Sequence, residues 1–311
     1  MGLGRAYMVA GADGMIGGAL AKSLRTSSER IVLTGLWQDG LSQDKIHLNL
    51  ASDPSEWELP DSIKTVYICS GITKLEECRK DPTGSSRVNV EGTIRFAETM
   101  INKGAFVVFL SSNHVFDGTI ANVPAHQPQN PKNEYGRQKT AVEKYLSKWP
   151  KQAAIVRLTK VIGPNSIFSR WAKSLRKDQP ISPFTDMVVS PIPLITVVSI
   201  LKLIGDQQLG GIWQVSGEQD INYLEAAHAI ARALGANNDL IKPSNTVKAG
   251  LDIETNPVNT SMDTKRLRQE LGLVPLPVYC IINQASSETL NEKKIEFKTK
   301  TGSLSDVFKE I

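Results

Sequence analysis

The chain has 311 residues, of which 41% are hydrophobic and 22% are charged, and its formal net charge is +4. This is the composition of an ordinary globular protein with ample material for a core. Lys and Arg are spread along the chain without interleaved aromatic residues, so we predict no nucleic-acid partner. The three cysteines, Cys69, Cys78 and Cys280, include no Cys-x-x-Cys pair, which argues against a disulfide framework and against a metal site.

The sequence also predicts a soluble, cytoplasmic protein without a membrane partner. Its amino terminus lacks a charged region followed by an apolar core. The most apolar run, residues 188–201, contains two prolines and is too short to span a bilayer.

The first predicted elements are a strand, a glycine-rich turn and a helix. Apolar residues 7–10 run into the turn at 11–18, and apolar residues then recur at helical spacing. Backbone amides of such a turn can approach a pyrophosphate at the positive end of the helix. The predicted cofactor contacts here are Gly11, Gly14, Met15, Ile16 and Gly17.

The end of the next predicted strand, 31–34, is the position that distinguishes NAD from NADP. An acidic side chain at its end would hydrogen-bond the adenosine ribose of NAD, but no carboxylate stands there. Residues 34–38 contain no Arg for a 2′-phosphate either. We therefore expect NADP or NAD, with a slight preference for NADP, and Thr34 as a cofactor contact.

Strand-like runs continue to alternate with helical segments. The strands are predicted at 7–10, 31–34, 65–69, 106–110 and 155–158, and the helices include 88–102 and 135–146. This alternation predicts right-handed βαβ units and an α/β fold with a parallel sheet covered on both faces.

Hydroxyl side chains follow the fourth of these strands. Ser111, Ser112, Asn113 and His114 come directly after residues 106–110, at the edge of a parallel sheet where ligands bind. Residues 117–134, rich in Pro and Asn, show no periodicity, so we predict a loop over the site.

A Tyr and a Lys lie four residues apart on the next helix. Tyr135 and Lys139 therefore project from the same helical face. A neighbouring cation favours the phenolate, so the pair could give or take a proton at a carbonyl or alcohol.

Three motifs in sequence carry a family resemblance: Gly11-x-x-Gly14-x-x-Gly17, residues 111–118, and Asn133-x-Tyr135-Gly136-x-x-Lys139. Together they resemble the extended short-chain dehydrogenase/reductases of the NAD-dependent epimerase/dehydratase superfamily. Within these, the chain is most similar to the dTDP-4-dehydrorhamnose reductase group, over roughly residues 5–275. The resemblance implies a Rossmann-type doubly wound parallel sheet with a smaller C-terminal substrate-binding lobe.

The same resemblance implies a division of the chain and a role for each matched residue. Residues 1–163 would bind the dinucleotide, and 164–285 would form the substrate lobe, partly interleaved with the first domain. Tyr135 would protonate the carbonyl oxygen, Lys139 would hold the nicotinamide ribose and lower the pKa of Tyr135, and Ser112 would hydrogen-bond the reacting oxygen. Further implied cofactor contacts are Asn49, Leu50, Cys69, Ser70 and Gly71, in addition to Tyr135 and Lys139.

Asn113 and His114 depart from the family pattern, which often has Asp-Tyr here. We predict that they bind substrate; the alternative for His114 is a satisfied polar residue at a strand end. The dehydratases resembling this family carry Asp-Glu at these positions, so the pair argues against dehydration.

These observations predict NAD(P)H-dependent reduction of a 4-keto group on a nucleotide-activated sugar. The alternatives are a nucleotide-sugar epimerase and a non-catalytic, NADP-binding regulatory subunit. Residues 286–311 form an extension of unknown role, in which Leu304, Val307, Phe308 and Ile311 fall on one helical face. That face would dock on the protein's own body, or would bind a second copy or another protein.

Overall fold

A computed structural model of the chain describes residues 6–26, 30–36, 42, 44–250 and 256–287. Its central feature is a seven-stranded parallel sheet with the order β10-β6-β5-β4-β1-β2-β3. The strands are β1 Tyr7–Ala10, β2 Ile31–Gly35, β3 Lys45–His47, β4 Thr65–Ile68, β5 Phe106–Ser112, β6 Ala153–Leu158 and β10 Gly211–Val215. The strand order reverses between β1 and β4, and such a reversal opens a crevice at the carboxyl ends of the strands. The predicted α/β fold is confirmed.

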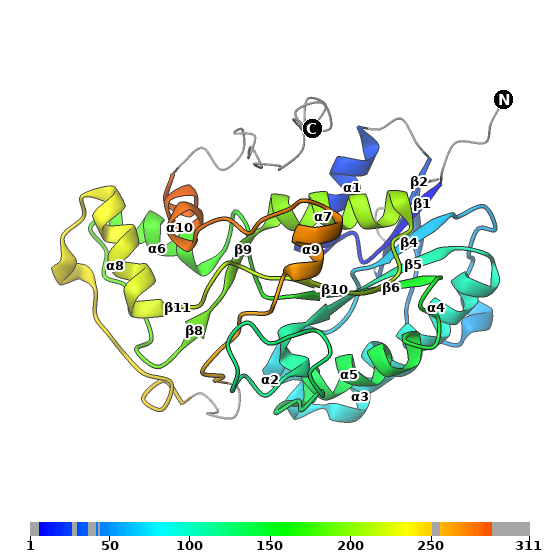
Figure 1. The fold of residues 1–311 in the computed structure, drawn as a ribbon, viewed down its shortest axis with the longest axis horizontal. Helices are drawn as coiled ribbons and strands as arrows, with labels where there is room; N and C mark the ends of the chain where they lie inside the picture. Colours follow the sequence, from blue (N-terminus) through cyan, green and yellow to red (C-terminus); the bar gives the residue numbers. More distant parts are fainter. Residues whose placement is uncertain (1–5, 27–29, 37–41, 43, 251–255, 288–311) are drawn as a thin grey trace.

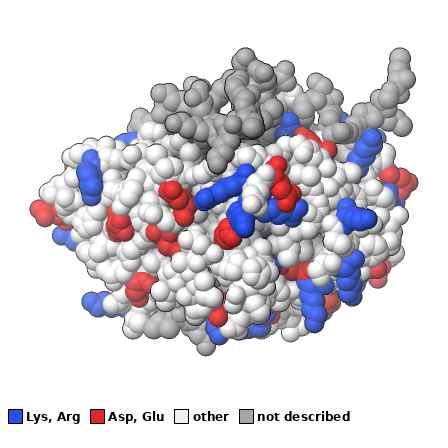
Figure 2. All heavy atoms as spheres, in the orientation of Figure 1, with Lys and Arg blue, Asp and Glu red and all other residues white. Residues whose placement is uncertain are grey.

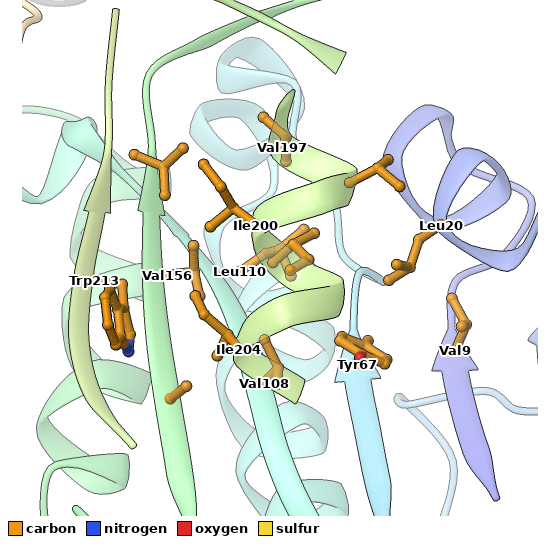
Figure 3. Close-up of a cluster of buried hydrophobic side chains, with 14 of the residues drawn as sticks. Val9, Leu20, Tyr67, Val108, Leu110, Val156, Val197, Ile200, Ile204 and Trp213 are labelled. Atoms are coloured by element: carbon orange, nitrogen blue, oxygen red, sulfur yellow. The ribbon is translucent and has the colours of Figure 1, made fainter. Parts of the chain in front are cut away.

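Helices cover both faces of this sheet. Figure 1 shows α1 (Met15–Arg25) and α7 (Leu194–Gln207) on one face, and α4 (Thr93–Asn102) and α5 (Glu134–Leu146) on the other. Because both faces are covered, β1, β4 and β5 are buried at every position and read as nearly continuous apolar runs. In Figure 3, Val197, Ile200 and Ile204 of α7 lie against Val108, Leu110 and Val156 of the sheet.

Before α4 the chain forms α2 (Leu75–Lys80), α3 (Pro82–Ser86) and a π-helical turn (Arg87–Gly92). The sequence predicted one helix over 88–102, and the structure divides it at Gly92. A Cβ at Gly92 would lie 1.9 Å from the carbonyl oxygen of Leu50, so the two backbones touch there. The remaining short turns are η1 Pro54–Glu56, η3 Asn113–Val115 and η4 Asn238–Leu240.

A second hydrophobic cluster lies beyond the sheet, around α6 (Ile167–Leu175), α8 (Tyr223–Leu234) and α10 (Val278–Ser286). The aromatic rings of Phe168, Trp171 and Tyr223 contact one another at its centre. Two small sheets border it: β8 (Val188–Val189) with β11 (Ile221–Asn222), and β7 (Lys160–Ile162) with β9 (Pro191–Pro193). Between β9 and β11 the chain returns to the large sheet: α7 covers one of its faces, and β10 joins it as a strand (Figure 1).

The helix α9 (Lys265–Glu270) begins after Thr264, whose side chain makes no capping hydrogen bond. The Asp263 carboxylate, one residue earlier, accepts a hydrogen bond from the Lys265 backbone N–H at 2.7 Å. Arg266 stacks on the Trp213 ring at 3.7 Å and donates to two carbonyl groups beside β10, so its role here is to hold α9 against the sheet.

Two further properties concern the surface and the chain end. Within the described ranges, no helix is long and apolar enough to cross a membrane. On the face in Figure 2, basic and acidic side chains are intermixed. The predicted amphipathic face at residues 304–311 lies outside the described residues.

Candidate cofactor and catalytic site

The glycine-rich turn lies at the reversal point of the sheet, against the loop that follows β4. Gly11 has a φ of +84°, and a Cβ there would lie 2.6 Å from the Ser70 backbone nitrogen. A Cβ at Gly17 would lie 2.2 Å from the Gly11 carbonyl oxygen, so α1 packs directly on the turn. Both positions require glycine because other residues would separate these backbones. The structure thus brings together the predicted contacts after β1 and those after β4.

Thr34 supports this turn from β2. Its buried hydroxyl accepts a hydrogen bond from Gly11 N at 3.3 Å, and its carbonyl accepts one from Ala12 N at 3.1 Å. Thr34 therefore fixes the turn next to the end of β2.

Three other predicted cofactor contacts differ in their exposure and in what they touch. Met15 is 48% exposed, and its sulfur faces Gly163, where a Cβ would lie 2.7 Å away. Leu50 is buried in the core, and the side-chain oxygen of Asn49 accepts a local hydrogen bond from Ala51 N at 2.9 Å. The contact of Asn49 and Leu50 with the cofactor stays a prediction.

The helix that carries Tyr135 and Lys139 begins at a side-chain cap. Asn133 Oδ1 accepts a hydrogen bond from Gly136 N at 2.8 Å, which satisfies a free amide of the first turn. A Cβ at Gly136 would lie 2.1 Å from the His114 carbonyl oxygen. Glycine at this position lets α5 approach the turn that follows Ser112, so the hydroxyl and the Tyr-Lys pair are brought to the same edge of the sheet.

Lys139 is buried beside the Tyr135 ring. Its Nζ lies 5.5 Å from the Tyr135 ring centroid and 4.6 Å from that of Phe109, and it donates to the Leu110 carbonyl at 2.9 Å. Ser112 Oγ accepts a hydrogen bond from His114 N at 3.3 Å and lies 3.3 Å from Asn113 Oδ1. The Ser112 hydroxyl therefore also takes part in a strand-end turn.

Burial controls the protonation of the pair. It raises the pKa of the Tyr135 phenol above its usual value, with a smaller contribution from Cys78. It also lowers the pKa of Lys139 to about 8. Desolvation of the phenolate is thus the main cause of the raised pKa of Tyr135, and the expectation that Lys139 lowers this pKa stays a prediction. Near neutral pH, Tyr135 is a neutral phenol that can donate a proton.

His114 is a neutral hydrogen-bonding group whose tautomer follows from its contact with Asn133. Because Asn133 Oδ1 caps α5, its Nδ2 is the atom that faces His114 Nδ1, at 3.0 Å. An amide nitrogen only donates, so Nδ1 accepts and the neutral ring carries its proton on Nε2. Burial lowers the His114 pKa to about 4, and its ring makes an edge contact with Tyr135 at 6.0 Å. A proton relay through His114 near neutral pH is therefore disfavoured.

Two hollows border this group and the predicted loop. A cavity of about 200 Å³ is lined by Asn113, His114, Phe116, Asp117, Gly118, Lys132, Asn133, Asn256 and Pro257. A second, of about 340 Å³, lies within residues 116–130. Residues 117–133 contain no helix or strand, as predicted, and they line most of the larger cavity and part of the smaller one.

A buried ion pair that sequence reasoning missed anchors this loop. Arg157 on β6 and Glu143 on α5 are each only 3% exposed and approach to 2.7 Å. Arg157 also donates to the Ala125 carbonyl at 3.0 Å, and Gln129 donates to Glu143 at 2.5 Å. The signal in the sequence was an Arg inside the apolar run 153–158, because a charge within a buried strand needs a partner.

A second buried network holds α5 in place. The Asn89 amide donates to Gln138 Oε1 at 2.7 Å and to the Ile72 carbonyl at 2.8 Å, and its oxygen accepts from Ile72 N. Gln138 in turn donates to Ser85 Oγ at 2.7 Å. This network ties the helix with Tyr135 and Lys139 to the loop that follows β4.

The parallel sheet, its strand order and the glycine turn at the reversal point define a Rossmann-type α/β protein of the class that binds dinucleotides. Comparison with known proteins gives the family. Residues 5–287 match the RmlD substrate binding domain, and the chain belongs to that family.

Individual relatives align with most of the chain. The chain is 24% identical over 284 residues to methionine adenosyltransferase 2 subunit beta of Bos taurus, covering 86% of this chain and 83% of that protein. It is 21% identical to a dTDP-4-dehydrorhamnose reductase of Aggregatibacter actinomycetemcomitans, covering 86% and 94%. A solved dTDP-4-dehydrorhamnose reductase of Bacillus anthracis, in complex with NADP, has a TM-score of 0.75, 19% identity and coverage of 90% and 98%.

Proposed function

We propose that the protein is an oxidoreductase that uses NADH or NADPH to reduce a 4-keto group on a nucleotide-activated sugar. One observation carries the proposal: Gly136 brings α5 against the turn after β5, so Tyr135, Lys139 and Ser112 share one edge of the sheet. The relative from Aggregatibacter actinomycetemcomitans, named a dTDP-4-dehydrorhamnose reductase, supports this substrate class.

Each side chain has a defined task in this proposal. When bound, the reduced nicotinamide supplies the hydride to the carbonyl carbon. Tyr135, a neutral phenol near pH 7, donates its proton to the carbonyl oxygen, and Ser112 donates a hydrogen bond to that same oxygen. Lys139 places a positive charge beside the phenol, which stabilises the phenolate as it forms.

The substrate would lie between the sheet and the second hydrophobic cluster. Asn113 and His114 line the cavity of about 200 Å³ next to Tyr135, and we assign them to sugar binding. His114 Nε2–H would donate to a sugar hydroxyl. Residues 164–285 would supply the substrate-binding lobe, while α7 and β10 within that range complete the dinucleotide-binding sheet.

A second candidate function is that of a non-catalytic subunit that binds the dinucleotide. The observation that favours it is a relative, over 86% of this chain, that is named as the beta subunit of methionine adenosyltransferase 2. A stable complex with another protein, combined with no oxidation of NADH or NADPH by any nucleotide sugar, would support this candidate.

The test is a screen of nucleotide-linked 4-keto sugars, with loss of reduced-nicotinamide absorbance as the readout. The wild-type protein should turn over at least one dTDP- or UDP-linked 4-keto sugar. Cofactor binding is titrated separately, so a protein that binds the cofactor but reduces no sugar is distinguished from one that binds neither. Binding without turnover across the screen would contradict the reductase proposal.

A further inference from the structure

Two charged side chains occupy the end of β2, where sequence reasoning found none. Asp13 comes from the glycine-rich turn, between Gly11 and Gly14, and Lys45 is the first residue of β3. Lys45 Nζ lies 2.7 Å from Asp13 Oδ1. A Cβ at Gly35, the last residue of β2, would lie 2.6 Å from Asp13 Oδ2 and 2.7 Å from Lys45 Cε.

The pair therefore fills the space into which a side chain at the end of β2 would project. In this class of fold, that position faces the adenosine ribose, and a carboxylate there hydrogen-bonds the 2′-hydroxyl. Gly35 offers no side chain, so the turn supplies the carboxylate from the opposite side. The sequence alone pointed slightly to NADP because it located no acidic residue at this position.

The relative exposure of the two groups decides which of them the ligand meets. The Asp13 side chain is 49% exposed, whereas the Lys45 side chain is 22% exposed. Lys45 thus lies behind the carboxylate and orients it. A hydroxyl gains a charge-assisted hydrogen bond from such a carboxylate.

A 2′-phosphate gains much less binding free energy at this position than a 2′-hydroxyl does. It carries nearly two negative charges, and it would meet the Asp13 carboxylate before the Lys45 ammonium. With both charges a few ångströms away, Coulomb attraction and repulsion largely cancel, while the phosphate still loses water. To bind it, the Asp13–Lys45 pair would have to separate.

We propose that Asp13, oriented by Lys45, accepts a hydrogen bond from the 2′-hydroxyl of the adenosine ribose and makes the protein prefer NADH to NADPH. This inference rests on the proposed binding of a dinucleotide at the glycine-rich turn. It does not depend on which sugar is reduced.

The experiment measures dissociation constants for NADH and NADPH from nicotinamide fluorescence, without any sugar. The wild-type protein should bind NADH at least about tenfold more tightly, the value of one charge-assisted hydrogen bond. Asp13→Asn should weaken NADH binding and strengthen NADPH binding, so that the ratio of the two constants falls about tenfold. Lys45→Met should weaken NADPH further, because it leaves the carboxylate without its counter-charge.

Asp61→Asn is the matched control. Asp61 also forms an ion pair with a lysine, Lys103. This pair lies at the amino-terminal ends of β4 and β5, whereas the glycine-rich turn lies at the carboxyl ends of the strands. This variant should keep the wild-type ratio. Circular dichroism verifies that each variant is folded. If Asp13→Asn does not fold, the ratios of the NADH and NADPH dissociation constants for the wild type and Lys45→Met still test the inference.

The possible failures are separable. A wild-type protein that binds NADPH as tightly as NADH, or more tightly, overturns the role of Asp13, as does an unchanged ratio in folded Asp13→Asn. A wild-type protein that binds neither cofactor overturns the proposed function itself.

Discussion

Asn133 links the start of α5 to the imidazole of His114: its Oδ1 caps the helix at Gly136 N, and its Nδ2 lies 3.0 Å from His114 Nδ1. One side chain therefore positions the helix that carries Tyr135 and fixes the tautomer of a neighbouring ring. Because Nδ1 is occupied as an acceptor, protonating His114 would turn the contact into a clash of two donors.

This relationship predicts a pH dependence of stability. The pKa of His114 falls from 6.5 to about 4 on folding, so between these values the unfolded chain binds more protons than the folded one. The free energy of unfolding should therefore decrease as pH falls from about 6.5 towards 4, by on the order of 3 kcal/mol in total. Urea unfolding at a series of pH values measures it.

His114→Gln provides the control, because its side-chain amide can replace the Nε2–H donor and does not titrate. The difference in stability between wild type and His114→Gln should shrink as the pH is lowered. Nitrogen NMR of the wild-type ring should also show the proton on Nε2 at pH 7. A ring protonated on Nδ1, or one that titrates near 6.5, would contradict the assignment.

Tyr135→Phe tests the proposed proton donor. The variant keeps the ring that contacts His114 and loses only the hydroxyl, so folding should be preserved. Turnover of a 4-keto sugar should fall about 10²- to 10⁴-fold, the usual contribution of a positioned acid. Tyr145→Phe, on the same helix but away from the site, should leave turnover unchanged. Full activity of Tyr135→Phe would exclude Tyr135 as the acid.

Much of this architecture follows from local sequence. The five predicted strands are visible because each is a short, almost uninterrupted apolar run, and the spacing of Tyr135 and Lys139 on one helix fixes their proximity. The glycines of the first turn could likewise be assigned, because a strand ends directly before them.

The features that could not be predicted depend on distant pairings. Lys45 reaches Asp13 only because β3 pairs with β2 in the register that sets Lys45 opposite Leu33. Arg157 lies within a predicted strand, but its partner could not be predicted, because only the packing of α5 on the sheet brings Glu143 against it. The raised pKa of Tyr135 could not be predicted for a related reason, because the burial of its phenol depends on the whole fold.

Lys139 should set the upper pH limit of the reaction. Its pKa is lowered to about 8 by burial, so above that pH the ammonium loses its proton and no longer stabilises the forming phenolate. The rate of sugar reduction at saturating substrate should decline as pH rises past about 8, and Lys139→Met should lose this decline together with most of its activity. A wild-type rate that stays level up to pH 10 would refute the role given to Lys139.

The buried pair of Arg157 and Glu143 should contribute strongly to stability when one partner alone is removed. Arg157→Met leaves the Glu143 carboxylate buried without its counter-charge and frees the Ala125 carbonyl, so the free energy of unfolding should drop by about 3–5 kcal/mol. The double variant Arg157→Met/Glu143→Leu removes both charges and should recover part of that loss. Denaturant unfolding of the wild type and the three variants, including Glu143→Leu, gives the coupling energy.

Because Arg157 and Glu143 also hold residues 125 and 129, limited proteolysis within 117–133 should become faster in Arg157→Met than in the exposed-pair control Arg137→Met. Equal stability of wild type and Arg157→Met would show that the pair does not anchor the loop.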